Sequence, residues 1–362
     1  MSKAAELANL IGNINAGGGG ANKNVIINGA MNVAQRGTSF SNVTSSQYCL
    51  DRFSVDVGGG GAFNVTQDTS APEGFEKSLK LEVNTADSSI ASADAYRVTQ
   101  AIEGQNIAQV DLGASTAKAM ALSFYVKSSV TGTYGVGLAN SAETENFVAE
   151  YTISSANTWE KKTINIPVRT SGTWLTTNGI GIGVRFDLGS GTNYNGTAGQ
   201  WQTTSSKVYR TSSCVNLIAT GSATWFITGV QLEVGQNPTS FEHINNFGEE
   251  LARCLRYFQN GAKGAGANEL VGDSHGHAES TTRVDFITNF PIEMRATPSI
   301  TKTEDFIFRE NGSNRAVTSV ALGNSTNRRA WIQGTTSGHT DEATGRVYTD
   351  GTNVAFTLDA EL

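Results

Sequence analysis

The sequence is poor in charge, in proline and in cysteine, and each scarcity narrows what the chain can be. Charged residues make up 16% of the 362 residues, and the formal net charge is -7. Because nucleic-acid binding requires clustered Lys and Arg, this balance disfavours a nucleic-acid partner. The cysteines Cys49, Cys214 and Cys254 are an odd set without metal-ligand spacing, which is typical of a protein made in a reducing cytoplasm.

Long apolar runs are missing as well. No segment reaches the ~20 apolar residues that a membrane-spanning helix needs, so we expect no membrane span. Residues 1–12 hold neither a basic leader nor a continuous apolar stretch, and we therefore expect no secretory signal. Glycine is abundant instead, with 40 residues against 5 prolines. Together with frequent Ser, Thr, Asn and Val, this composition indicates β structure.

Residues 3–14 carry an apolar stripe at helical spacing. A helix this short is marginal alone in water, and the glycines at 17–20 separate it from the rest of the chain. Its apolar face either packs on its own domain, or joins copies of itself in a three-helix bundle, or docks onto a different protein. We favour the intermolecular interpretations. The residues of the stripe are Leu7, Leu10, Ile11 and Ile14.

From residue 24 to about 245, apolar and polar residues alternate with a period of two. Each such segment predicts a strand with one face toward a core and one toward water. Several strands between Gly-rich and Asn-rich turns, with no helices between them, predict antiparallel sheets packed as a jelly-roll sandwich. The apolar sets begin at Phe53, Leu79, Met120, Ile180 and Phe226, and alternation places Phe53, Phe124, Phe186 and Phe226 in the core.

The last part of the chain predicts a linker helix and a second β domain. Residues 247–258 combine an apolar face with two glutamates near the start, where the helix dipole favours negative charge. The glycine-rich stretch at 261–268 reads as a flexible break. Asp350-Gly351 indicates a hairpin between two strands. The predicted domains are thus a short amino-terminal helix at 1–23, a jelly roll at 24–245, and a linker helix with a smaller terminal β domain at 246–362.

Several motifs occur in an order that resembles virion appendage and tail fibre proteins of bacteriophages. The resemblance implies a jelly roll similar to carbohydrate-binding modules, joined by a short helix to a terminal β head. It also implies a homotrimer whose amino end faces other virion proteins and whose distal β domains face the host surface. The motifs are NVIINGAMNVAQRG at 24–37, YCLDRF at 48–53, ITGVQLEVG at 227–235, SFEH at 240–243, GEELARCLRYF at 248–258 and FTLDAEL at 356–362.

Signals for catalysis are weak. GDSHGH at 272–277 is similar to the nucleophile block of one esterase class, with Ser274 as nucleophile, but the strands and helices which that fold needs around it are not predicted. We interpret the stretch as a polar loop. Asp187, Glu233 and Glu242 show no spacing typical of a hydrolase pair, and alternation places Glu233 on the solvent face. We therefore expect no enzymatic activity and no cofactor.

Two metal sites are conceivable from the sequence. His275 and His277 point to the same side of an extended strand, so three copies around a trimer axis would present six imidazoles to one transition-metal ion. Isolated surface histidines are common, and this alternative stays open. Asp51 and Asp56 could bind a structural calcium ion, but no pattern fixes them as ligands.

Sugar binding is the more plausible chemistry. Saccharide rings stack their C–H faces on exposed aromatic rings flanked by polar side chains. The polar stretch between Trp174 and Trp201, which contains Tyr194, is the first candidate, and Trp331 and Tyr348 are candidates in the terminal domain. Large aromatics in β domains are also frequent in cores, so both interpretations remain open for each ring.

The function expected from these observations is that of a structural virion protein. It would be a homotrimeric tail fibre that attaches to a glycan or another receptor on the host cell surface. Three weak sites engaging one surface would gain avidity. The alternatives are a head or collar decoration protein without a receptor role, and an esterase or depolymerase acting on surface polysaccharide. The expected location is the virion tail, after synthesis in the host cytoplasm.

Overall fold

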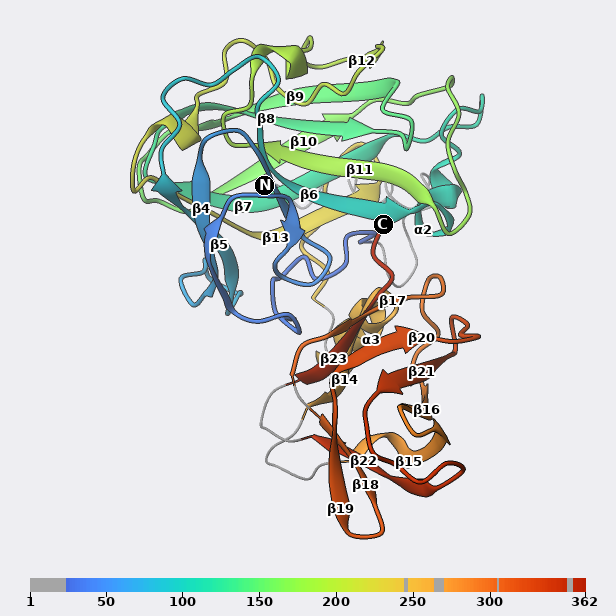
Figure 1. Ribbon diagram of the computed structural model, residues 1–362. Helices are drawn as coiled ribbons and strands as arrows, with labels where there is room; N and C mark the ends of the chain where they lie inside the picture. Colours follow the sequence, from blue (N-terminus) through green and yellow to red (C-terminus); the bar gives the residue numbers. More distant parts are fainter. Residues whose placement is uncertain (1–23, 244–246, 264–269, 305, 350–353) are drawn as a thin grey trace. The chain divides into compact units, whose positions relative to one another are not determined.

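The computed structural model describes residues 24–243, 247–263, 270–304, 306–349 and 354–362, so the predicted apolar stripe from Leu7 to Ile14 lies outside the described residues. The chain divides into two compact units (Figure 1). The first extends to Glu250 and includes Leu362, and the second spans Leu251–Glu361. Antiparallel strands dominate both units, which confirms the predicted mainly β fold class. No helix in the described ranges is long and apolar enough to cross a membrane.

The first unit is a sandwich of two antiparallel sheets. The chain passes repeatedly from one sheet to the other, as in a jelly roll, so strands adjacent in sequence often lie in different layers. The six-stranded sheet has the order β1 (Ser39–Val43), β4 (Ala62–Asp68), β5 (Ser78–Thr85), β13 (Thr224–Val234), β7 (Met120–Ser128) and β10 (Glu160–Ile166). The seven-stranded sheet has the order β12 (Trp201–Thr203), β9 (Glu145–Ile153), β8 (Gly132–Ala139), β11 (Ile180–Asp187), β6 (Ala95–Glu103), β3 (Ser54–Gly58) and β2 (Gln47–Tyr48).

The core of this unit lies between the two sheets and follows the period-two pattern of the sequence. Alternate residues of β7 and β11 meet there, and the ring of Phe124 contacts that of Phe186 with centroids 5.1 Å apart. Burying a side chain of this size contributes about 1.5–3 kcal/mol, so the alternation also fixes which face of each strand turns inward. The predicted core positions of Phe53, Phe124 and Phe186 are confirmed.

Strand β13 departs from the simple alternation. Its pairing with β7 shifts between Thr228 and Gln231, which marks a β-bulge, and Gly229 adopts a positive φ of 61° there. The bulge changes which residues face inward, because Trp225 and Ile227 join the core before it and Val230 and Leu232 after it. Phe226 is buried, as predicted, but it does not belong to the cluster between the two sheets. Its ring lies on the other face of the sheet, beneath the Lys127 ammonium at 4.0 Å from the ring centroid.

Short helices connect some of the strands. An α-helical turn, α2 (Gly104–Ile107), and a 3-10 turn, η1 (Ala108–Val110), follow β6. Further 3-10 turns are η2 (Thr192–Tyr194) and η3 (Leu217–Ala219). Helix α3 (Phe247–Leu255) begins with Glu249 and Glu250 in its first turn, as the helix dipole favours. The predicted helix at 247–258 was too long, because Phe258 already begins a strand.

The second unit consists of two further antiparallel sheets around its own core. A three-stranded sheet has the order β14 (Phe258–Lys263), β23 (Val354–Asp359) and β17 (Ser299–Lys302). A seven-stranded sheet has the order β19 (Ser313–Val317), β18 (Phe306–Glu310), β22 (Thr344–Thr349), β15 (Leu270–Ser280), β16 (Arg283–Asn289), β21 (Arg329–Thr335) and β20 (Ser319–Leu322). Rings of Phe286, Phe306 and Phe356 meet in the core with centroids 5.9–6.4 Å apart.

Two predictions for the second unit need correction. The stretch read as a flexible break begins inside β14, since Gly261–Lys263 pair with β23; residues 264–268 lie outside the described residues. The hairpin predicted at Asp350-Gly351 is also wrong, because β22 pairs with β15 and β18 whereas β23 pairs with β14 and β17 in the other sheet. Residues 350–353 themselves lie outside the described residues.

The three cysteines are all buried. Burial raises the pKa of the Cys49 thiol to about 12, and it also raises the pKa of Cys214. Because the thiolate is the reactive form, burial keeps these side chains chemically inert in the folded protein.

Candidate functional site

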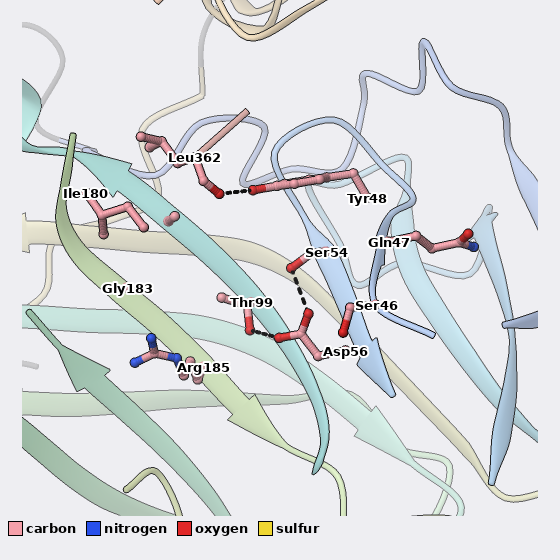
Figure 2. Close-up of a pocket in the computed structure, with 11 residues that line it drawn as sticks. Ser46, Gln47, Tyr48, Ser54, Asp56, Thr99, Ile180, Gly183, Arg185 and Leu362 are labelled. Carbon is pink, nitrogen blue, oxygen red and sulfur yellow. Dashed lines mark hydrogen bonds between the residues drawn. The ribbon is translucent and has the colours of Figure 1, made fainter. Parts of the chain in front are cut away.

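A pocket of about 240 Å³ opens on the outer face of the seven-stranded sheet in the first unit, the face turned away from the sandwich core. Its floor is made by β3, β6 and β11, which lie side by side in the sheet (Figure 2). Most of the lining residues have polar side chains, but the surface that they expose to the pocket is mainly apolar. The lining comprises Ser46, Gln47, Tyr48, Ser54, Asp56, Thr99, Ala101, Ile180, Gly183, Arg185 and Leu362.

The floor follows from strand alternation. Val184 and Phe186 of β11 turn into the core, so Gly183 and Arg185 must turn outward. On the neighbouring strand β6, Thr99 pairs with Arg185 and Ala101 pairs with Gly183. The small residues Gly183 and Ala101 are therefore neighbours on the outer face, next to the longer Arg185 and Thr99. Because Gly183 has no side chain, a hollow is left there.

Arg185 is the central charged group of the pocket. The residue is only 8% exposed, and its guanidinium lies above Gly183, where an added Cβ would be 3.4 Å from Nη2 and 3.7 Å from Nη1. Nη2 donates a 2.8 Å hydrogen bond to the Glu143 carboxylate. Burial, with a smaller effect from the nearby charge of Arg97, lowers the pKa of the guanidinium, although arginine stays charged at any physiological pH.

Asp56 is the carboxylate of the pocket, and its own neighbours hold it in place. Its Oδ2 accepts hydrogen bonds from Arg97 Nε at 2.7 Å and from Thr99 Oγ1 at 2.9 Å. Ser54 Oγ lies 3.5 Å from Oδ1 (Figure 2). Because Arg97 and Asp56 form a largely buried ion pair, this carboxylate brings little uncompensated negative charge into the pocket.

A loop covers the adjacent part of the same sheet face. Tyr209 lies over Gly137 and Arg210 over Gly135, so closely that a Cβ at either glycine would overlap with them. Tyr209 also stacks against the Arg97 guanidinium at 4.9 Å from its ring centroid. The outer face is thereby closed above β8, whereas above β6 and β11 the pocket is open.

Trp174 and Trp201, both predicted to contact sugar, are brought together by the fold. Their rings meet edge to face with centroids 5.5 Å apart, and both are partly buried against the main core. Each indole N–H donates to a backbone carbonyl, that of Trp174 to Ser171 at 3.0 Å and that of Trp201 to Pro167 at 2.7 Å. Trp201 begins β12 at one edge of the seven-stranded sheet, and β2 forms the opposite edge beside the pocket.

Tyr194 lies apart from this tryptophan pair. Its ring stacks on the buried Tyr209 with centroids 4.8 Å apart, and its hydroxyl donates to the carbonyl of Ala93 at 2.9 Å. One face of the ring is thus occupied by protein. The role of Tyr194 in this arrangement is to support the loop that covers β8, and a contact with sugar remains a prediction.

The two aromatic candidates of the second unit differ in exposure. Trp331 is partly exposed on β21, where its indole N–H donates to Asp285 Oδ2 at 3.0 Å and its ring packs against Gly323. Tyr348 is only 8% exposed within β22, between strands β15 and β18. Burial leaves little of the Tyr348 ring for a ligand, and a contact with sugar stays a prediction for both residues.

The GDSHGH segment is a strand and not the polar loop that we predicted. Ser274, His275 and His277 lie in β15, which pairs with β16 and β22, so Ser274 is not at a strand-to-helix turn. His277 Nε2 lies 3.3 Å from a carboxylate oxygen of Glu342, and the imidazole is 41% exposed. The extended backbone confirms that the two histidines point to one side, but metal binding at a trimer axis stays a prediction.

The candidate carboxylates serve the fold. Glu233 was expected on the solvent face, yet it is 2% exposed and accepts hydrogen bonds from Gln231, Thr239 N and Thr239 Oγ1. Asp187 accepts the backbone N–H of Ser190 at 2.9 Å, within a turn, and burial raises its pKa. Glu242 accepts the backbone N–H of Asn24 at 3.1 Å.

Asp51, one of the two calcium candidates, is buried and accepts hydrogen bonds from the backbone and side chain of Gln35. Asp56 belongs to the pocket and is bound to Arg97. Within the described ranges, no group of three or more His, Cys, Asp or Glu side chains could hold a metal ion.

The sequence analysis missed the pocket, although part of its signal was present. The alternation that places Ile182, Val184 and Phe186 in the core also places two glycines and one arginine at the intervening outward positions of β11. Outward glycines on a central strand indicate a hollow or a close approach of another group. The partners of Arg185 on β3 and β6 depend on strand order, which the sequence does not show.

No protein family model matches the sequence, and no curated protein matches it. Solved structures with a similar fold include the enzymatically active domain of tailspike protein 4 of bacteriophage CBA120, with 15% identity over 59% of this chain and a TM-score of 0.31. The match spans about a fifth, 21%, of that tailspike chain.

Two carbohydrate-binding modules are also similar in fold. The family 11 module from Clostridium thermocellum, solved with a mixed-linked β-1,3-1,4 tetrasaccharide, is 10% identical over 57% of this chain and 97% of its own, with a TM-score of 0.28. The family 61 module TmCBM61, solved with β-1,4-galactotriose, is 14% identical over 58% of this chain and 98% of its own, with a TM-score of 0.27. At these values the likenesses do not assign a family.

Proposed function

We propose that this chain is a non-enzymatic structural protein of a bacteriophage tail fibre, which attaches the virion to glycans on the host cell surface as a homotrimer. The observation that supports it most directly is the pocket on the outer face of the seven-stranded sheet, which combines apolar surface with several polar side chains. A sugar site needs fixed hydrogen-bonding groups over a preformed hollow. Thr99, Asp56 and Arg185 supply such groups on three adjacent strands whose positions are set by the sheet.

The proposed virion role and the proposed homotrimer are supported by features of the sequence. The ordered motifs from residue 24 to 258 resemble phage appendage proteins, and the predicted apolar stripe from Leu7 to Ile14 would join three chains. The absence of catalysis is part of the same proposal. It is supported by the structural roles of Asp187 and Glu233, which hold turns by accepting backbone N–H groups.

The glycan role is tested by measuring binding of the purified full-length chain to an array of bacterial surface polysaccharides and oligosaccharides. Thr99→Val keeps the shape of the side chain but removes the hydroxyl that donates to Asp56. We expect this variant to weaken binding to the best ligand by roughly threefold to tenfold, since one hydrogen bond contributes about 0.5–1.5 kcal/mol. The matched control is Thr152→Val, an exposed threonine on β9 of the same sheet.

Two results would contradict the proposal. One is an array with no bound glycan, and the other is equal binding by the wild-type chain and the Thr99→Val variant. The mass of the particle in solution, measured by light scattering, checks the trimer. Incubating the bound glycan with the protein and assaying reducing ends and acetate checks the absence of catalysis, because an esterase or a depolymerase would release one of them.

A further inference from the structure

Arg185 has more hydrogen-bond donors than its described neighbours use. A guanidinium carries five N–H groups. The hydrogen bond to Glu143 engages Nη2, whereas Nε and Nη1 are buried and have no hydrogen-bond partner among the described residues. Leaving buried N–H groups of a charged side chain unpaired is unfavourable, because they lose their hydrogen bonds to water and gain none in return. Arg185 lines the pocket, so a turn of its guanidinium would bring these nitrogens, which have almost no exposed surface now, to an acceptor that enters the pocket.

The carboxylates nearest to Arg185 are already engaged. Asp56 accepts from Arg97, Thr99 and Ser54, and Glu143 is shared with Lys207, whose Nζ lies 3.1 Å from Oε2. Arg97 itself has a buried Nη1 without a hydrogen-bond partner in the described part of the chain. Two adjacent guanidinium groups therefore keep unused donors, whereas the acceptors around them are occupied.

We propose that the pocket selects an acidic sugar, a uronic acid residue within a surface polysaccharide, whose carboxylate accepts hydrogen bonds from the unpaired N–H groups of Arg185. Hydroxyls of the same ring would pair with Ser54 and Thr99 on the neighbouring strands. This inference rests on the proposed glycan attachment and specifies the chemical class of the ligand.

Charge distinguishes this ligand from a neutral sugar. A hydroxyl could fill the same donors, but it would leave the buried positive charge of Arg185 without a further counter-charge. Charge-assisted hydrogen bonds are shorter and roughly twice as strong as neutral ones, and arginine suits carboxylates because its planar donors match two oxygens. Burial removes water from the Arg185 cation. This loss of water lowers the pKa of the guanidinium, and it is also the reason why a counter-charge is favourable there.

The test compares each acidic oligosaccharide with its own neutral form. Trimers of galacturonic, glucuronic, mannuronic and guluronic acid are titrated calorimetrically against the full-length protein, together with their methyl esters. We expect at least one acid to bind tenfold or more tightly than its ester, which is the range that a charged hydrogen bond supports. The preference should shrink as salt is raised from 50 to 500 mM, to a degree limited by burial of the pair.

Three variants locate the preference. Arg185→Gln should remove the difference between acid and ester, and Arg185→Lys should retain only part of it, because a lysine keeps the charge but loses the planar donors. Gly183→Ala places a methyl group beneath the guanidinium, with van der Waals distances of 3.4–3.7 Å and an ordinary backbone conformation, so it should fold normally and still weaken acid binding. Lys161→Gln on β10 of the opposite sheet changes the net charge equally and serves as control.

The outcomes separate the two proposals. If neutral glycans bind as tightly as acids and Thr99→Val weakens both, the acidic preference is wrong and glycan attachment stands. If acids are preferred but Gly183→Ala and Arg185→Lys bind like the wild-type chain, the acidic site is elsewhere and this inference is overturned. If no glycan binds, both proposals fail.

Discussion

At the scale of the residue, His339 in the second unit is a buried titratable side chain. Its side chain has no exposed surface, its ring meets Phe308 with centroids 5.1 Å apart, and Nε2 lies 2.9 Å from Thr336 Oγ1. Burial lowers the pKa of this imidazole, and the Glu310 carboxylate at 3.5 Å offsets part of the effect. The folded protein therefore holds His339 neutral at pH values where the unfolded chain already begins to bind a proton.

This predicts the direction of one pH effect. The pKa of His339 in the folded protein lies below the ordinary value near 6.5. The stabilisation that comes from a neutral His339 is therefore fully present above pH 6.5, and it is lost as the pH falls through that value toward the lowered pKa. We expect the thermal midpoint of the wild-type chain to fall more between pH 7.5 and pH 5.5 than that of His339→Gln. His277→Gln, which changes a partly exposed histidine of the same unit, is the control. Equal slopes for the wild-type and His339→Gln proteins would contradict the prediction.

The alternation along β11 predicts the face of Arg185 but not its burial. It predicts that Arg185 faces outward, as the structure confirms, but an outward arginine is most often solvated. Here Arg185 is only 8% exposed, and its guanidinium is held by a hydrogen bond to Glu143. The chemistry of the site comes from that burial, which depends on contacts far apart in the sequence.

At the scale of the element, the bulge in β13 can be tested directly. Gly229 has a φ of 61°, and a Cβ there would lie 2.7 Å from the ring of Phe75. Gly229→Ala should therefore lower the free energy of unfolding by about 1–3 kcal/mol, through backbone strain and overlap together. Chemical denaturation measures the change. The control is Gly221→Ala, because a Cβ at Gly221 meets no atom within 4 Å; equal stability of the two variants would mean that the bulge is not strained.

The strands also show which parts of the fold could be predicted from the sequence. The strands whose apolar residues alternate without interruption, such as β7 and β11, were predicted with the correct inward faces. For Phe226 the predicted burial is correct but the predicted face is not, because one extra residue at the bulge reverses the alternation within a single strand. The prediction failed for the segment around Ser274 because weak strand propensity there is overridden by pairing with β16 and β22.

The candidate site was predictable only in part. Aromatic residues in a polar stretch led to Trp174 and Trp201, and the fold does bring them together. The pocket depends on pairing between β3, β6 and β11, which are separated by many residues in the chain. Strand order of this kind follows from the packing of the whole sandwich and not from any local pattern.

At the scale of the whole molecule, the two units have separate cores, which predicts separate effects of core mutations. Phe356 is fully buried in the second core, so Phe356→Ala should destabilise that unit by about 3–5 kcal/mol. Glycan binding at the pocket should persist, because all pocket strands belong to the first unit. Phe124→Ala in the first core should instead abolish or weaken binding. Differential scanning calorimetry and titration measure both effects, and loss of binding in Phe356→Ala would show that the units are energetically coupled.

The burial of Cys49, Cys214 and Cys254 has a practical consequence for such measurements. Maleimide reagents attack thiolates, so the native chain should remain nearly unlabelled at neutral pH, and all three positions should react once denaturant opens the fold. One cysteine introduced at an exposed site such as Thr152 would then carry a fluorophore alone. The chain can therefore be labelled at a single site for single-molecule measurements of its binding to a cell surface, without removal of any of its own cysteines.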